Sequence, residues 1–238
     1  MIMKTKKELV SENKHDFESL VSLMAALRSE GGCPWDREQT HASSRKCLIE
    51  ETYEVVEAID KEDPELLCEE LGDLMFQAVF HAQIEAEEGR FDIGDVIQGI
   101  THKMIVRHPH VFADTEVSDS DEVIVNWDNI KKEEKHLEGK SAILRRVPPF
   151  MPALMRAQKV QGKALKKFGY GTATQDEAWK KIDSCISSGK DTDEDAITEA
   201  LFALCALSEM KGIDLEELLS KKTEAFISDF EKEEAVDN

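Results

Sequence analysis

Two acidic clusters in this 238-residue sequence have the spacing of ligands for a hard cation. Glu51 and Glu54 lie three residues apart in one predicted helix, and Glu70 and Asp73 lie three apart in the next. Residues with this separation share a helix face, where like charges repel each other. Mg²⁺ would remove that repulsion, because it prefers carboxylate and water oxygens. On spacing alone, a solvated acidic face accounts for the clusters equally well.

The elements that must position these carboxylates are two helices joined by a tight turn. The first is predicted over 44–60, with an apolar stripe at Leu48, Thr52, Val55 and Ile59. Asp63 and Pro64 have the residue types of an N-cap and a first helical position, so the second helix begins there and runs to about Gln83. Its apolar stripe is Leu67, Leu71, Leu74 and Ala78. Antiparallel packing of the two helices would bring the four carboxylates to one seam.

The rest of the chain has the same helical period. A helix behind Asp16 carries apolar residues at i, i+3, i+4 and i+7 spacing, and another begins near Asp92 and must end before Pro109. Further helices are predicted over 176–187, 193–209 and 214–231. Because no segment shows convincing strand alternation, the predicted fold class is all-α, a helical bundle.

Composition excludes several classes of protein. Fifty acidic residues against thirty Lys and Arg give a net charge of −20, a field that repels nucleic-acid backbones. The longest apolar run has eight residues, whereas a membrane-spanning helix needs about twenty. No apolar segment follows the N-terminal lysines, so no signal peptide is expected. Five scattered cysteines without a C-x-x-C pair favour a reduced, cytoplasmic protein.

A proline cluster divides the chain. Three of the six prolines fall in the segment 148–152, and none follows it. Proline-rich stretches of this kind favour a joint between folded parts. We therefore predict one domain over 15–147 and a second over 153–238.

Several uncommon motifs together resemble the MazG branch of the all-α nucleoside triphosphate pyrophosphohydrolases. Both acidic clusters match its Glu-Glu-x-x-Glu and Glu-Glu-x-x-Asp signature, and the similarity extends from about residue 17 to 163. The other matching motifs are Gly32-Cys-Pro-Trp-Asp36, Gln39-Thr-His41, Glu69-Glu-Leu-Gly-Asp-Leu74, Arg107-His-Pro-His-Val-Phe112 and Trp127-x-x-x-Lys131-x-x-Glu134-Lys135.

This resemblance implies hydrolysis of nucleoside triphosphates between the α and β phosphates, giving a monophosphate and pyrophosphate, as nucleotide-pool house-cleaning. The implied cofactor is Mg²⁺, with Mn²⁺ as an alternative, held by Glu51, Glu54, Glu70 and Asp73. The cation would neutralise the phosphates and lower the pKa of a bound water, which would attack the α-phosphorus in line. Glu50 is the candidate to orient or deprotonate that water.

A basic pair is the candidate clamp for the phosphates. Lys103 and Arg107 are four residues apart on one helix face, and an Arg can grip two phosphate oxygens. The plainer interpretation is a solvated basic edge at a helix C-terminus. Trp35, Trp127 and Lys131 are candidates to line the base or phosphate end of the nucleotide site, although a Trp is more often a core residue than a platform for a base.

The second half resembles a degenerate copy of the first. Where the family pattern has its acidic clusters, this chain has Lys180-Lys-Ile-Asp-Ser-Cys-Ile186 and only two scattered acids, Asp195 and Glu199. The basic pair would fall at Ala225 and Asp229. We therefore predict a packing or dimerisation unit over 153–238. A homodimer is expected, because a two-helix site usually needs a partner surface to complete it.

Three alternatives remain open from the sequence. A related pyrophosphohydrolase acting on phosphoribosyl-ATP or dUTP would share the carboxylate pattern, and a non-catalytic scaffold could retain the seam as a remnant. A metal site of another kind fits less well. The Glu-x-x-His pairs required by a di-iron bundle lie off the apolar stripes, and the zinc-type spacing of Cys33, His41 and Cys47 is unusual.

Overall fold

The computed structural model of this chain describes residues 3–113, 115, 117–120, 122–123, 126–127, 130, 140–187 and 194–237. All regular secondary structure in these residues is helical, which confirms the predicted all-α class. The chain forms two compact units, Met1–Glu133 and Glu134–Asn238. This division does not assign an activity to either unit. The catalytic role of 15–147 and the packing role of 153–238 therefore stay predictions. No helix in the described part of the chain is long and apolar enough to cross a membrane.

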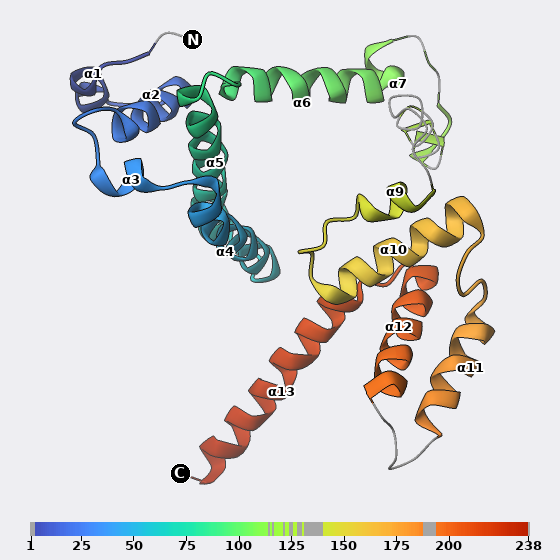
Figure 1. Cartoon of the computed structure of the whole chain (residues 1–238). Helices are drawn as coiled ribbons and strands as arrows, with labels where there is room; N and C mark the ends of the chain where they lie inside the picture. Colours follow the sequence, from blue (N-terminus) through green and yellow to red (C-terminus); the bar gives the residue numbers. More distant parts are fainter. Residues whose placement is uncertain are drawn as a thin grey trace. The chain divides into compact units, whose positions relative to one another are not determined.

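The first unit is a set of seven described helices in which α4 and α5 form a hairpin (Figure 1). Their bounds are α1 Lys6–Ser11, α2 Phe17–Arg28, α3 Pro34–Glu38, α4 His41–Asp60, α5 Pro64–Glu87, α6 Ile93–Arg107 and α7 Pro109–Phe112. The predicted N-cap Asp63 is confirmed, since its side chain accepts hydrogen bonds from first-turn amides. Asp16 and Asp92, near which helices were predicted to begin, cap their helices in the same way. Helix α4 begins at His41, before the predicted start at 44, because Thr40 and Ser43 form a capping box.

The core of this unit lies between α2, the C-terminal half of α5 and the first residue of α6. Its buried members are Val21, Met24, Val79, Phe80, Ala82 and Ile93. The carboxylate-bearing parts of α4 and α5 lie outside it. Ile59 and Leu71, which the predicted stripes would bury, are 55% and 46% exposed. The chain itself therefore leaves part of the α4–α5 apolar surface uncovered.

The short helix α3 is fixed to this core by Arg28. Its guanidinium forms two 2.9 Å hydrogen bonds with the Glu87 carboxylate and donates to the carbonyl of Gln39 at 3.1 Å. The same group lies 5.1 Å from the centre of the Phe80 ring. Gly32 allows the preceding turn to close, because a Cβ there would lie 2.1 Å from the carbonyl oxygen of Leu27. The Gly-Cys-Pro-Trp segment thus has a defined place against α2 and α5.

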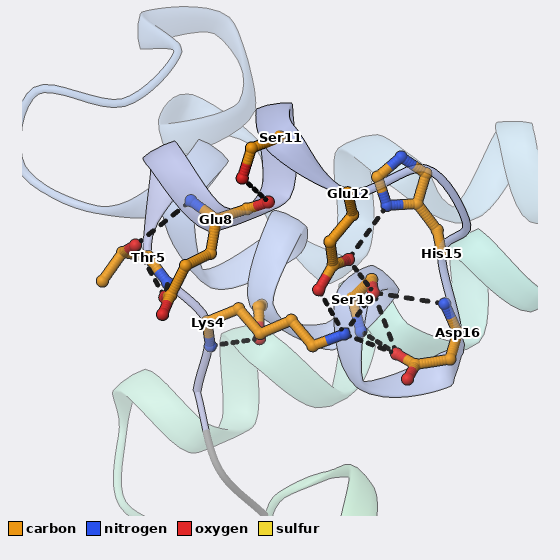
Figure 2. Close-up of polar contacts among 9 residues, drawn as sticks. Lys4, Thr5, Glu8, Ser11, Glu12, His15, Asp16 and Ser19 are labelled. Carbon is orange, nitrogen blue, oxygen red and sulfur yellow. Dashed lines mark hydrogen bonds and ion pairs between the residues drawn. The ribbon is translucent and has the colours of Figure 1, made fainter.

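Helix α1 is held to α2 by polar contacts around Lys4 (Figure 2). The Lys4 ammonium lies 2.8 Å from Glu12, 2.9 Å from Asp16 and 2.7 Å from the Ser19 hydroxyl. Because α1 itself contains no buried residue, apolar burial contributes little to its attachment. Hydrogen bonds from Lys4 and Ser19 hold the pKa of Asp16 well below its usual range, and the pKa of Glu12 is lowered mainly by Lys4.

We expect Lys4→Met to release α1 without unfolding the unit. Amide hydrogen exchange over residues 6–11 should accelerate by a factor on the order of ten, since local opening no longer breaks the Lys4 contacts. Exchange around the fully buried Met24 should stay unchanged. Lys7→Met is the control, because Lys7 is exposed and lies on the same helix. Equal exchange in the wild type and Lys4→Met would show that the contacts do not fasten α1.

A second polar cluster ties the start of α4 to α5. His41 Nδ1 lies 2.8 Å from His81 Nδ1, and His41 Nε2 lies 2.6 Å from Glu85 Oε1. Arg90 also binds both carboxylate oxygens of Glu85. The Arg90 hydrogen bonds, with a smaller contribution from His41, lower the pKa of Glu85 from 4.5 to about 2. Burial lowers the pKa of His81.

Because of this cluster, we expect the free energy of unfolding to depend on pH in the acidic range. A carboxylate whose pKa is depressed by folding stabilises the folded state above its unfolded pKa, and that contribution is lost as pH falls from about 4.5 to about 2. Arg90→Met should therefore lower the free energy of unfolding at pH 6 and lower it less at pH 3. Urea denaturation at both pH values measures the difference. Lys61→Met, which removes an exposed cation paired with Glu57, should not change the pH dependence.

The second unit packs α10 and α11 on α12. Its described helices are α9 Lys140–Arg145, α10 Ala153–Phe168, α11 Gln175–Ile186, α12 Glu194–Lys211 and α13 Leu215–Asp237. Gly162 permits close contact between α10 and α12, because a Cβ there would lie 2.3 Å from Glu209 Oε1. The buried Gln158 amide donates to the carbonyl of Ile213 at 2.7 Å and accepts from the amide of Leu215 at 3.1 Å. These two bonds fix the start of α13 against α10.

Candidate metal and nucleotide site

The α4–α5 hairpin brings three of the predicted metal ligands together. One carboxylate oxygen from each of Glu51, Glu70 and Asp73 can be chosen so that all three lie within 4.8 Å of one another. Glu51 comes from the middle of α4, and the other two come from the first half of α5. Glu51 and Glu70 are partly buried, whereas Asp73 is exposed. Antiparallel packing across the Asp63–Pro64 turn thus gathers three of the four carboxylates that were predicted to share this seam.

Glu54 belongs to the same electrostatic cluster. The pKa of Glu51 is raised, and burial is the largest cause. A hydrogen bond with Glu54 and charge repulsion from Glu54, Asp73 and Glu70 raise it further. The pKa of Glu70 is raised by burial, then by repulsion from Glu54 and other acids. These carboxylates therefore hold their negative charge at a free-energy cost. A divalent cation relieves that cost, and its preference for hard oxygen donors matches the residues present.

Other metal-ligand arrangements receive less support. In the part of the chain that the structure describes, histidines and cysteines do not gather into a comparable group of three. His41 and Glu85 are in contact, but their atoms are engaged with each other and with Arg90. The Glu133/His136 pair lies outside the described residues. The all-carboxylate seam is therefore the best candidate metal centre.

Glu50 lies apart from the three gathered ligands. Its side chain is half-exposed and forms a 2.9 Å ion pair with Lys46, one turn earlier on α4. A neighbour in sequence on a helix points about 100° away around the axis, so Glu50 cannot share the direction of Glu51. Its assignment as the group that handles water stays a prediction.

The basic candidates lie near the end of α6. Lys103 is exposed and Arg107 is half-buried in the last turns of this helix. Trp127 packs edge-on against His108, the residue after Arg107, with ring centres 4.7 Å apart. Trp35 is 63% exposed on α3. Lys131 lies outside the described residues.

A single chain does not bring this basic group to the carboxylates. Figure 1 shows α6 running outward from the C-terminal end of α5 instead of back along it. Asp73 lies fourteen residues before the end of α5, which is about 21 Å of helix. Sequence spacing could not reveal this separation, because it depends on the direction in which the chain leaves the turn at 88–92. Two residues mark the turn itself in the sequence: Gly89, which has a φ of 68°, and Asp92, which caps α6.

The sequence of this chain is similar to those of several known proteins. Residues 39–112, which include both acidic clusters and the basic pair, match the MazG nucleotide pyrophosphohydrolase domain. The chain is 39% identical over 233 residues to a nucleoside triphosphate pyrophosphohydrolase of Escherichia coli, covering 93% of this chain and 88% of the relative. It is 40% identical over 225 residues to a nucleoside triphosphate pyrophosphohydrolase/pyrophosphatase MazG of Thermotoga maritima, covering 92% and 86%.

A further relative has a higher sequence identity over a shorter length. The uncharacterized protein YabN of Bacillus subtilis is 50% identical over 147 residues, which is 62% of this chain but 30% of YabN. The relatives in Escherichia coli and Thermotoga maritima are matched over most of both lengths, so their similarity extends through both compact units. The predicted family is thereby confirmed: this all-α chain is an enzyme of the MazG nucleotide pyrophosphohydrolase family.

Proposed function

We propose that this protein hydrolyses nucleoside triphosphates between the α and β phosphates, giving a nucleoside monophosphate and pyrophosphate, and so clears unwanted triphosphates from the nucleotide pool. The observation that carries the proposal is the gathering of Glu51, Glu70 and Asp73 in a member of this family. Relatives matched over most of their length bear the name nucleoside triphosphate pyrophosphohydrolase. The five described cysteines are free, in keeping with the reducing cytoplasm that we infer as its location.

Glu51, Glu54, Glu70 and Asp73 would hold the metal, for which we infer Mg²⁺, with Mn²⁺ as an alternative. When bound, the cation would neutralise phosphate charge and lower the pKa of a coordinated water. The chain contributes a fixed set of carboxylates on two packed helices, where Glu51 and Glu70 are already partly withdrawn from solvent. Glu50 would orient or deprotonate the attacking water. Its exposed ion pair with Lys46 is weak enough to rearrange when substrate binds.

We infer that the phosphate clamp comes from a second copy of the chain in a homodimer. Lys103 and Arg107 lie on a helix that leaves the α4–α5 pair, so a partner subunit would supply the charge that the leaving pyrophosphate needs. Helix α4 also presents a partly exposed apolar face, with four residues at helical spacing: Ile49, Tyr53, Val56 and Ile59. Burying such a face against a partner is favourable.

Trp35, Trp127 and Lys131 would provide the remaining contacts with the nucleotide. Trp35 presents a largely exposed ring that could stack on a base, and Trp127 lies beside the helix end that carries Arg107. Lys131 would add a phosphate contact. No group in this set reads a particular base edge, so we expect tolerance for several triphosphates.

The second unit would serve packing or dimerisation. Lys180 and Glu199 are exposed, and the only retained acids of the second acidic cluster, Asp195 and Glu199, both lie on α12. At the end of the unit, Phe226 and Phe230 are 70% and 61% exposed on α13. An exposed apolar surface that lacks metal-ligand residues is typical of a protein interface rather than of an active site.

Product analysis tests the function directly. The protein is incubated with each common NTP and dNTP plus Mg²⁺, and nucleotides and phosphates are resolved by ion-exchange chromatography. We expect a monophosphate with pyrophosphate, and loss of both on addition of EDTA. A diphosphate with orthophosphate would contradict the proposed bond. Light scattering at working concentration tests the dimer, which a monomeric mass would refute.

A further inference from the structure

The second unit contains a cavity that the proposed reaction does not use. It lies between α9, the proline-rich loop, the start of α10 and α12, and has a volume of about 320 Å³. Small-molecule sites begin at about 300 Å³, so the space suits a compact ligand. Its lining residues are Leu144, Arg145, Pro149, Met151, Ala153, Arg156, Ala157, Val160 and Phe202.

The lining combines an apolar wall with positive charge. Its side chains are mostly aliphatic or aromatic. Arg145 and Arg156 are also present, and the described lining residues include no Asp or Glu. This is unusual in a chain whose net charge is −20. A guanidinium gives directed hydrogen bonds to carboxylates and phosphates, and its flat face packs on aromatic rings.

Arg156 is the cavity-lining arginine that the chain itself satisfies least. Its Nε atom is buried and has no hydrogen-bond acceptor among the described residues. A buried donor without an acceptor is rare, because it loses water and gains nothing in return. Two residues further along the same helix, the buried Gln158 has partners for both its amide nitrogen and its oxygen. The unit therefore satisfies the buried amide of Gln158, whereas the guanidinium of Arg156 is held with one buried donor unpaired among the described residues.

The start of α10 strengthens the positive potential. Ala153, its first residue, lines the cavity, and the N-cap Pro152 provides no side-chain oxygen for the first-turn amides. Helix N-termini favour negative charge. The helix end and the two arginines thus act in the same direction.

We propose that this cavity binds a small organic anion with a flat apolar body, such as an aromatic phosphate or carboxylate. The charged group pairs with Arg156 and Arg145, and the apolar body packs against Phe202 and its neighbours. Two arginines and no acidic residue among the described lining residues favour an anion over a cation as the ligand. The site is separate from the carboxylate seam, which belongs to the other unit.

The test uses the full chain with phenyl phosphate as the probe, in EDTA so that no cation draws the probe to the carboxylate seam. Binding is measured by titration calorimetry. We expect saturable binding that weakens at least tenfold in Arg156→Met and is lost in Ala157→Phe, which fills the cavity but keeps both arginines. Lys180→Met is the matched control, because it removes a positive charge from an exposed position of α11 in the same unit. Its affinity should equal that of the wild type.

Two comparisons complete the experiment. Inorganic phosphate should bind at least tenfold more weakly than phenyl phosphate, because it lacks the apolar body, and equal affinity would overturn the proposal. Benzoate measured alongside identifies the preferred charged group, and tight binding of either aromatic anion supports the site. Undiminished binding to Arg156→Met and Ala157→Phe, or no saturable binding to the wild type, would refute it. Arg156→Lys replaces Arg156→Met if circular dichroism shows that the latter is unfolded.

Discussion

Replacing Glu70 with Gln is expected to abolish nucleotide hydrolysis while leaving the fold intact. Glu70 is one of the three carboxylates that gather at the seam, and Gln keeps its size but removes its charge. The turnover rate should fall at least about a hundredfold, since even residues outside the ligand shell of a metal site cost 10- to 100-fold. Initial rates of pyrophosphate release at saturating Mg²⁺ measure the effect.

The stability of this variant separates a catalytic from a structural role. Burial and neighbouring acids raise the pKa of Glu70, so removing its charge relieves repulsion in the absence of metal. The melting temperature in EDTA should therefore be unchanged or higher. Glu69→Gln is the matched control, because this neighbouring carboxylate is exposed and lies outside the gathered set. Wild-type turnover in Glu70→Gln would remove Glu70 from the site.

Replacing Arg107 with Ala is expected mainly to weaken nucleotide binding. An arginine that grips phosphate oxygens makes charge-assisted hydrogen bonds, and losing them corresponds to a rise in KM of about ten- to a hundredfold. The change in kcat should be smaller, because the carboxylate seam remains intact. Steady-state kinetics over a range of triphosphate concentrations separate the two constants. Lys61→Ala removes an exposed cation from the α4–α5 turn and should change neither.

Mixed dimers decide whether the clamp acts on the same chain or on the partner. Chains carrying Glu70→Gln and chains carrying Arg107→Ala are co-expressed with different tags and purified by both. If the clamp reaches the partner's carboxylates, each mixed dimer has one complete site and about half of the wild-type activity at low substrate. If the clamp serves its own chain, both sites are defective and activity stays at the level of the single variants.

The seam is specified mostly by local sequence. Glu51 shares a helix face with Glu54, as Glu70 does with Asp73, and Asp63 with Pro64 fixes where the second helix starts. Helical periodicity and an N-cap depend on neighbours within four residues, so a single sequence contains the information. The same holds for the all-α class and for the motifs that identify the family.

Helix lengths were less predictable than helix starts. Helix α5 continues to Glu87, beyond the predicted end at Gln83, and its last turn is held by the distant Arg28. Helix α10 was absent from the predicted ranges, and its Gly162 packs against the Glu209 side chain of α12. In both cases the deciding partner is far away in the sequence, where periodicity carries no signal.

The sequence by itself determined the all-α class, most of the longer helices, the family and the set of carboxylates that could share a cation, because each depends on residues a few positions apart. Only the tertiary structure decided which side chains meet. It gathers Glu51, Glu70 and Asp73 and gives Glu50 a separate partner in Lys46. It also places Arg107 at the end of α6, a helix that runs outward from the C-terminal end of α5. These outcomes depend on how the helices pack and on the direction in which the chain continues after each turn. Packing of that kind is set by contacts across the whole unit, which the spacing of residues along one helix cannot encode.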